Sequence, residues 1–233
     1  MSEKICNGFF VDTDVPAFMG KKLHLPAISR DSFAKGIVHR SKNSIFNYFA
    51  WPTVTSDENG VLYATSAAFG TDHICPFTKA GMFVSRNGGK TWTPPVVIAE
   101  GYMPTGSASI VYLGNGKMIV GYGYHPGDVL YQDFYTRING TLWEESVTAS
   151  GKGLLRQTLI DLYPTFPVDQ LIGGSFVMTS DDYGVTWSDP VRVPVINPHG
   201  PCQLPDGTLL LAGQEFYADP SETYKVFQGG AYT

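Results

Sequence analysis

Aspartate and histidine side chains gather in three short loops of this sequence. "TDHICP" contains Asp72 and His73, "YHPGD" contains His125 and Asp128, and "NPHGP" contains His199. A carboxylate and an imidazole can exchange protons and can hydrogen-bond a polar ligand, so these loops are candidates for acid–base catalysis or ligand binding. A purely structural role is the alternative, because an Asp can cap its own loop and His199 can pack between its flanking prolines.

Charge and hydropathy exclude two classes of partner. The chain has 233 residues, with 16 Lys and Arg against 21 Asp and Glu, which gives a net charge of −5. It has no basic run, so a nucleic-acid partner is not expected. No apolar stretch approaches the roughly 20 residues of a membrane span, and the N-terminus does not resemble a signal peptide. The sequence therefore predicts a cytoplasmic protein with no membrane segment.

The cysteines do not suggest a metal site or a disulfide framework. Cys6, Cys75 and Cys202 are far apart and odd in number, so we expect free thiols and no metal or cofactor. A metal site that combines Asp72, His73 and His199 is an alternative, and it requires the first and third loops to converge.

Pairs of β-rich runs around short turns recur along the chain. They lie at 51–68 around "DENG", at 81–100 around "RNGG", at 107–124 around "GNG" and at 200–216 around "PDG". Such turns between apolar runs are typical of β-hairpins. The first two pairs give four strands in one antiparallel sheet, and the later pairs begin the same pattern again. A repeated four-stranded sheet predicts an all-β fold of the β-propeller type.

This repeat divides the chain into one partial propeller domain. We expect an N-terminal segment at 1–44, a blade at 45–99, a second blade at 107–195 and an incomplete third blade at 198–233. An early strand is possible at "GIVHR" (36–40). The second blade would contain a partly helical insertion near 131–172, because leucines recur there with a helical period. Alternatively, "TRINGTLW" (136–143) begins a separate blade.

An eight-residue pattern occurs twice, as "SRNGGKTW" (85–92) and "SDDYGVTW" (180–187). Each copy lies between two predicted strands, which makes it a hairpin turn. The Asn or Asp can accept bonds from turn N–H groups, the Gly suits a positive φ, and the Trp returns to the sheet. A structural role is therefore predicted for Ser85, Asn87, Gly89, Trp92, Ser180, Asp182, Gly184 and Trp187.

The octets resemble the Asp-box, or bacterial neuraminidase repeat, of sialidases and related six-bladed β-propellers. The surrounding sequence, such as "DHICPFTKAGMFVSRNGGKTW", is similar to that of bacterial sialidase-like glycoside hydrolases. The resemblance covers about residues 45–233 and implies roughly three blades. It also implies that the octets lie at the periphery, away from an active site.

The resemblance further implies a glycosidase acting on a glycan or glycoside, with no cofactor. Asp72 occupies the place of the acid/base, with His73 beside it, while Ala50 in "AWPT" stands where the family has the first Arg of a carboxylate clamp. Arg40 is the early Arg that could substitute for it. The other clamp residues, a Glu and a Tyr nucleophile belong to later blades.

Substrate binding is expected of the loops around His125, Asp128 and His199, which would rim the central cleft. A non-catalytic carbohydrate-binding or interaction propeller is the alternative function. An open blade edge would also permit pairing with a second copy of the chain.

Overall fold

The computed structural model describes two compact units, residues 1–37 and 38–233. The described residues are 4–6, 9–11, 15–18, 21–23, 36–42, 45–71, 78–101, 105–124, 165, 167, 174–197, 199–217 and 225–232. Only the backbone is described in the strands before residue 24 and at residues 196, 214–217 and 225–232. Strands account for the regular structure of these residues, and none of them is α-helical. Within the same part of the chain, no helix has the length and hydropathy to cross a bilayer.

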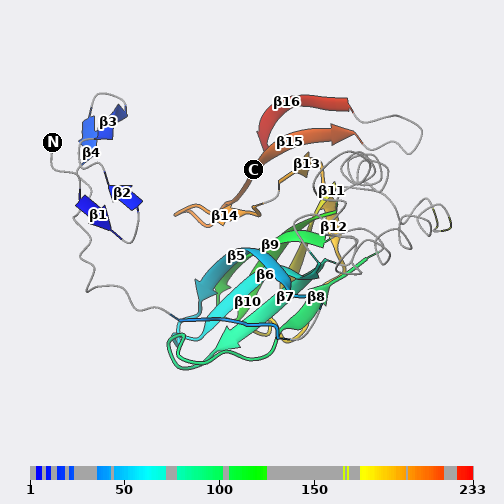
Figure 1. The fold of residues 1–233 in the computed structure, drawn as a ribbon. Helices are drawn as coiled ribbons and strands as arrows, with labels where there is room; N and C mark the ends of the chain where they lie inside the picture. The colour runs from blue at the N-terminus through cyan, green and yellow to red at the C-terminus, as the bar shows by residue number, and fades with distance from the viewer. Residues whose placement is uncertain are drawn as a thin grey trace, which may run out of the picture. The chain divides into compact units, whose positions relative to one another are not determined.

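The first unit contains two short hairpins (Figure 1). Strand β1 (Lys4–Cys6) pairs with β2 (Phe9–Val11), and β3 (Val15–Phe18) pairs with β4 (Lys21–Leu23), both antiparallel. These four strands were not predicted from the sequence. The strand expected at "GIVHR" was wrong, since residues 36–40 form no strand. A short run with two β-branched residues has β propensity, but a strand also needs a partner whose N–H and C=O groups it can pair.

The second unit begins with a four-stranded antiparallel sheet, called here the first sheet. Its order is β5 (Tyr48–Ser56), β6 (Leu62–Gly70), β7 (Lys79–Ser85) and β8 (Val96–Ala99). The "DENG" turn between β5 and β6 forms as expected: Asp57 Oδ1 accepts the N–H groups of Asn59 and Val61, each at 2.9 Å, and Gly60 has a φ of 76°. The four strands predicted for the segment before residue 100 therefore form one sheet.

A second four-stranded antiparallel sheet follows, called here the second sheet. It contains β9 (Thr105–Gly114), β10 (Lys117–Tyr124), β11 (Gly174–Ser180) and β12 (Val191–Val193), in that order. The long connection between β10 and β11 contains the predicted insertion, which lies outside the described residues apart from 165 and 167. The two sheets thus share one strand order, with an octet between the third and fourth strands of each.

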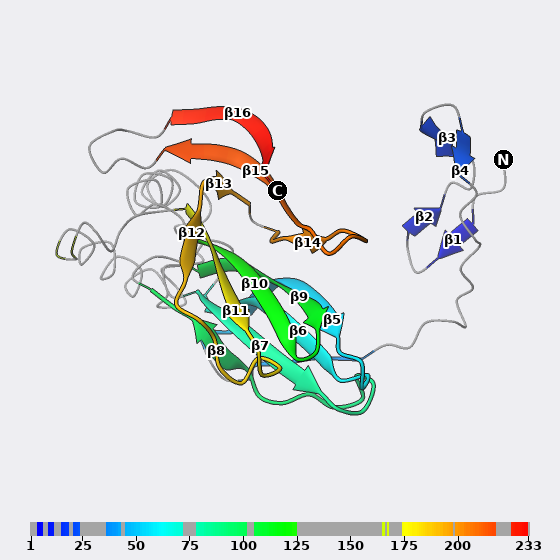
Figure 2. The ribbon, with the colours of Figure 1, turned by 180° about the vertical axis from the view of Figure 1, so that it is seen from behind.

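The last strands form a further antiparallel sheet. Strand β15 (Leu209–Tyr217) pairs with β13 (Val195–Ile196), β14 (Cys202–Gln203) and β16 (Lys225–Tyr232). The "PDG" hairpin is confirmed, because Cys202 faces Leu210 and Gln203 faces Leu209. Figure 2 shows β15 and β16 as a long curved pair.

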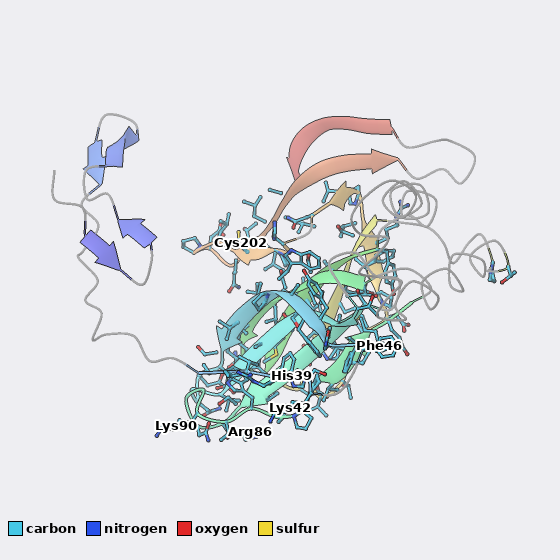
Figure 3. The ribbon with its side chains drawn as sticks, in the orientation of Figure 1. His39, Lys42, Phe46, Arg86, Lys90 and Cys202 are labelled. Atoms are coloured by element: carbon cyan, nitrogen blue, oxygen red, sulfur yellow. The ribbon has the colours of Figure 1, made fainter. Side chains whose placement is uncertain are left out.

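The core lies between the first and second sheets. Its buried side chains come from alternate positions of both, including Tyr63 and Met82 from the first sheet and Ile110, Met118 and Val120 from the second. The alternation follows from the two-residue period of a strand. On the other face of the first sheet, the ring of His39 packs 4.5 Å from Phe49 and 5.6 Å from Phe83, measured between centroids (Figure 3).

Threonine hydroxyls join β5 and β6 to the edge of β9. Thr65 Oγ1 donates to the carbonyl of Ala108 at 2.7 Å, and Thr53 Oγ1 accepts the Ile110 N–H at 3.0 Å. The two hydroxyls lie 2.9 Å apart. Because unpaired edge groups invite association with other chains, this network both fixes the two sheets and protects the edge.

We expect Thr65→Val to lower the free energy of unfolding by about 1–3 kcal/mol, since it removes the shorter of the two hydroxyl bonds to the Ala108 carbonyl and leaves only the 3.4 Å bond from Thr53 Oγ1. Thr65 is fully buried, and Val has nearly the same shape. Urea denaturation measures the change. Thr55→Val is the comparison: the half-buried Thr55 hydroxyl accepts one longer bond, 3.2 Å from the Tyr112 N–H, and should cost less. Equal stability of Thr65→Val and the unmodified chain would contradict the role given to this network.

Candidate functional site

The loops that carry the candidate residues leave from one end of the two sheets. In the first sheet, Tyr48 at the start of β5 pairs with Gly70 at the end of β6, just before Asp72. In the second sheet, Thr105 at the start of β9 pairs with Tyr124 at the end of β10, just before His125. We call this end the loop edge. The octets begin at the last residues of β7 and β11, so they lie at the opposite end.

The two sheets touch at the loop edge. Thr71 and Thr78, which flank the first loop, are both buried, and the Thr105 N–H donates to the Thr78 carbonyl at 2.9 Å. The start of β9 therefore lies beside the start of β7, and the bases of the two loops lie near each other. This arrangement follows from the shared strand order of the sheets.

Four of the candidate residues lie outside the described part of the chain. They are Asp72 and His73 in the first loop and His125 and Asp128 in the second. Of the described candidates, Arg40 has an exposed side chain and precedes β5. Ala50 lies in β5, half-buried and paired with Ala67.

The segment that carries His199 is tied to the loop edge. Asn197 is 8% exposed; its N–H donates to the Ser175 hydroxyl at 2.8 Å, and this hydroxyl donates back to the Asn197 carbonyl at 3.2 Å. Ser175 lies near the start of β11. The Asn197 side chain accepts the His199 N–H and donates to the Ala212 carbonyl. The His199 side chain is exposed, so its backbone is held while its imidazole remains accessible.

Gly200 and Pro201 fix the same segment against the second sheet. A Cβ placed on Gly200 would overlap the side chain of Ser109, and one placed on Gly121 would lie 2.9 Å from Pro201 Cδ and 3.0 Å from Gly200 Cα. These glycines permit a backbone-to-backbone approach that no larger residue allows. The sequence pattern singled out His199 but not Asn197 or Gly200, although an Asn before Pro is a recognisable turn signal.

Three aromatic rings lie at the loop end of the second sheet. Tyr122 stacks on Phe176 with centroids 5.8 Å apart, and Tyr124 packs on the same ring at 5.0 Å. Burial raises the pKa of both tyrosines, so each stays protonated through the physiological range. The Tyr124 hydroxyl donates to the Glu100 carbonyl at 2.9 Å. No local sequence pattern marks this cluster.

The octets adopt the turn that the sequence predicted. In the second copy, the buried Ser180 hydroxyl accepts the Gly184 N–H at 2.9 Å and donates to Asp182 Oδ1 at 2.8 Å. Asp182 also accepts the Thr186 N–H at 2.8 Å and the Thr186 hydroxyl at 2.6 Å. Trp187 packs against the core between the sheets.

The first copy repeats this geometry with Asn in place of Asp. Ser85 accepts the Gly89 N–H, and Asn87 Oδ1 accepts the Thr91 N–H, each at 2.9 Å. Gly89 and Gly184 have φ values of 82° and 78°. Figure 3 shows Arg86 and Lys90 of the first copy at the turn end of the first sheet, away from the strand ends that carry the candidate loops. The same turn bonds therefore form in both copies.

The ionisation of Asp182 makes the stability contributed by the second octet depend on pH. Bonds from the Thr186 hydroxyl, the Thr186 N–H and the Ser180 hydroxyl lower the pKa of Asp182 from 3.8 to about 2. A lowered folded-state pKa stabilises the fold above the unfolded value, and this contribution is lost as the pH falls from about 4 to about 2.

We therefore expect Asp182→Asn to lower the melting temperature at pH 7, where the ionised carboxylate contributes fully, and to flatten its dependence on pH between about pH 4 and pH 2, so that the two proteins converge near pH 2. The first octet shows that Asn can make the same turn. The reciprocal change, Asn87→Asp, should add a dependence of the same sign. Scanning calorimetry across this range tests both variants; an Asp182→Asn profile parallel to that of the unmodified chain would refute the assignment.

Comparison with solved structures identifies the class of fold. The sequence matches no protein-family model and no curated protein sequence. Solved structures do match. The chain is nearly all β with antiparallel sheets, and the structures that it matches are β-propeller glycosidases.

Two of these structures are of the NanB sialidase from Streptococcus pneumoniae. One, in complex with 2-[(3-chlorobenzyl)ammonio]ethanesulfonate, is 15% identical with a TM-score of 0.52, and covers 92% of this chain and 52% of the sialidase. The K499G mutant is 14% identical with a TM-score of 0.52, and covers 84% of this chain and 46% of the sialidase. An α-L-arabinanase from Penicillium chrysogenum, in complex with arabinobiose, is 15% identical with a TM-score of 0.43, covering 78% of this chain and 44% of the arabinanase. This chain thus spans about half the length of the sialidase structures that it matches.

Proposed function

We propose that this chain forms part of a sialidase-like glycoside hydrolase that binds its glycan at the loop edge. The observation that carries the proposal is the repeated unit: two four-stranded sheets of the same order, each with the same octet between its third and fourth strands. This repeat, together with the likeness in fold to a sialidase, favours a propeller glycosidase.

The proposed roles follow the position of the loops. Asp72 acts as the acid/base beside His73, and His199, His125 and Asp128 hydrogen-bond the sugar. Two features support a site here: the loop bases meet at one edge, and the Asn197 network holds the backbone of His199 while leaving its side chain exposed. Arg40 is the proposed partner for a substrate carboxylate, since a guanidinium fork suits that group.

A non-catalytic carbohydrate-binding propeller is the second candidate function. It is favoured by Ala50, which is half-buried, uncharged and paired with Ala67 in the strand where the resemblance places a clamp Arg. An alanine methyl group cannot bind a carboxylate, so recognition of an acidic sugar would have to rely on other residues.

Two assays on the purified chain separate the candidates. A glycan array with sialylated, galactosylated and uncharged oligosaccharides measures binding, and a panel of chromogenic aryl glycosides, aryl sialosides included, measures hydrolysis. Binding with hydrolysis supports the enzyme. Binding without hydrolysis of any glycoside removes the enzyme claim for this chain and leaves the carbohydrate-binding propeller. Absence of both contradicts the two candidates together.

A further inference from the structure

The first strands of the two sheets carry equivalent β-bulges. In β5, Trp51 and Pro52 lie opposite the single residue Ser66, because Ala50 pairs with Ala67 and Thr53 pairs with Thr65. In β9, two residues likewise lie opposite one, between the pairs Gly106–Gly123 and Ser109–Gly121. A bulge of this kind bends the strand and re-aims a side chain, and such bulges are frequent next to functional sites.

Both bulges place a residue other than glycine in the left-handed region. The φ angles are 49° at Trp51 and 50° at Ser107. This conformation is unfavourable for any residue with a Cβ and a clear outlier for a bulky one. Pro52 further restricts the backbone of the residue before it.

The two bulges carry very different side chains. Ser107 is 7% exposed, whereas the much larger Trp51 is half-buried in its sheet. Since Ser107 supports the same backbone in the second sheet, the bulge does not require an indole. The bulge by itself therefore does not determine the choice of Trp at position 51.

A second aromatic side chain lies next to Trp51. The Tyr48 and Trp51 rings pack edge to face, with centroids 6.3 Å apart and planes at 69°, and Tyr48 is also half-buried. Tyr48 pairs with Gly70, so this pair lies at the loop edge, where β6 leads into the Asp72 loop. Partly exposed rings of this kind offer a flat apolar face with a polar tip, which suits a ligand that is apolar on one side and polar at its rim.

We propose that Tyr48 and Trp51 form an aromatic subsite that binds one sugar ring by stacking against its C–H face. The subsite rests on the proposed function and adds a ligand class and two binding residues to it. In this interpretation the bulge, which both sheets share, aims Trp51 toward the bound glycan.

The test is calorimetric titration of the purified chain with 3′-sialyllactose, lactose and N-acetyllactosamine. Trp51→Ser copies the residue of the equivalent bulge, so it should fold and should weaken binding about tenfold or more, as expected for a buried aromatic contact. Trp51→Phe keeps a ring and should retain most of the affinity. Val54→Ser, on the same strand with a side chain 61% exposed, is the matched control and should bind normally.

Stability separates the subsite from a structural role. If Trp51 served the fold, Trp51→Ser would lower the melting temperature and Val54→Ser would not, with affinity per folded molecule unchanged; that result would overturn the subsite. Normal affinity in a stable Trp51→Ser variant would also overturn it and leave the proposed function standing. If the unmodified chain binds none of the three probes, the result contradicts both the subsite and the proposed function.

Discussion

Gly200→Ala is expected to destabilise the chain by about 2–5 kcal/mol, because it adds left-handed strain to a steric clash. Gly200 has a φ of 73°, and a new Cβ would overlap the buried Ser109 on β9. The backbone on both sides is fixed, by Pro201 against Gly121 and by the Asn197 bonds, so the segment has little room to move. Chemical denaturation of the Gly200→Ala variant and of the unmodified chain measures the difference in the free energy of unfolding.

Gly207→Ala provides the matched control. Gly207 has a φ of 89°, and no atom lies within 4 Å of a Cβ placed there. This variant isolates the backbone strain and should cost about 1–2 kcal/mol. Adding Ser109→Gly to the Gly200→Ala variant should restore part of the lost stability, since the two sites touch and their effects should not add. Equal costs at positions 200 and 207, with no rescue, would show that the close approach does not matter.

The glycosidase proposal predicts a large kinetic effect at Asp72. Asp72→Asn should lower kcat for the hydrolysed aryl glycoside by about 100-fold or more, because an amide cannot deliver or take up the proton that a general acid/base transfers. Since Asn is nearly isosteric, KM should change far less. Steady-state kinetics with purified variants of equal melting temperature gives both constants.

Asp128→Asn is the comparison for this prediction. Asp128 follows the second strand of its sheet, as Asp72 does, but its proposed role is to bind the sugar, so its replacement should raise KM more than it lowers kcat. A loss of kcat at Asp128 with none at Asp72 would reverse the two roles. Unchanged kcat in both variants would remove acid/base catalysis from these loops.

Much of the fold could be predicted because its signals are local. The hairpins at "DENG", "GNG" and "PDG" form where the sequence places them, and each turn is satisfied by residues close in sequence, as when Asp57 accepts the N–H groups of Asn59 and Val61. The strand proposed at 36–40 failed because its composition says nothing about a partner strand. The blade boundaries and the number of blades stay predictions.

The candidate site was predictable only in outline. Loop residues such as Asp72 and His199 stand out by residue type, but the groups that support them do not. Asn197 and Ser175 are 22 residues apart, and the Tyr122–Phe176 pair spans the whole insertion between β10 and β11. Nothing in the surrounding sequence marks either pair as a contact.

The sequence alone determined the octet turns, since Ser180, Asp182 and Gly184 satisfy one another within five residues and need no distant partner. The tertiary structure decided what depends on distant backbones: the Thr65–Ala108 bond between sheets, the contact of Gly200 with Ser109, and the bulge that gives Trp51 its conformation. The physical reason is that hydrogen bonds within a turn are fixed by nearby torsions. Edge pairing, close approach and strain exist only once two sheets have packed together.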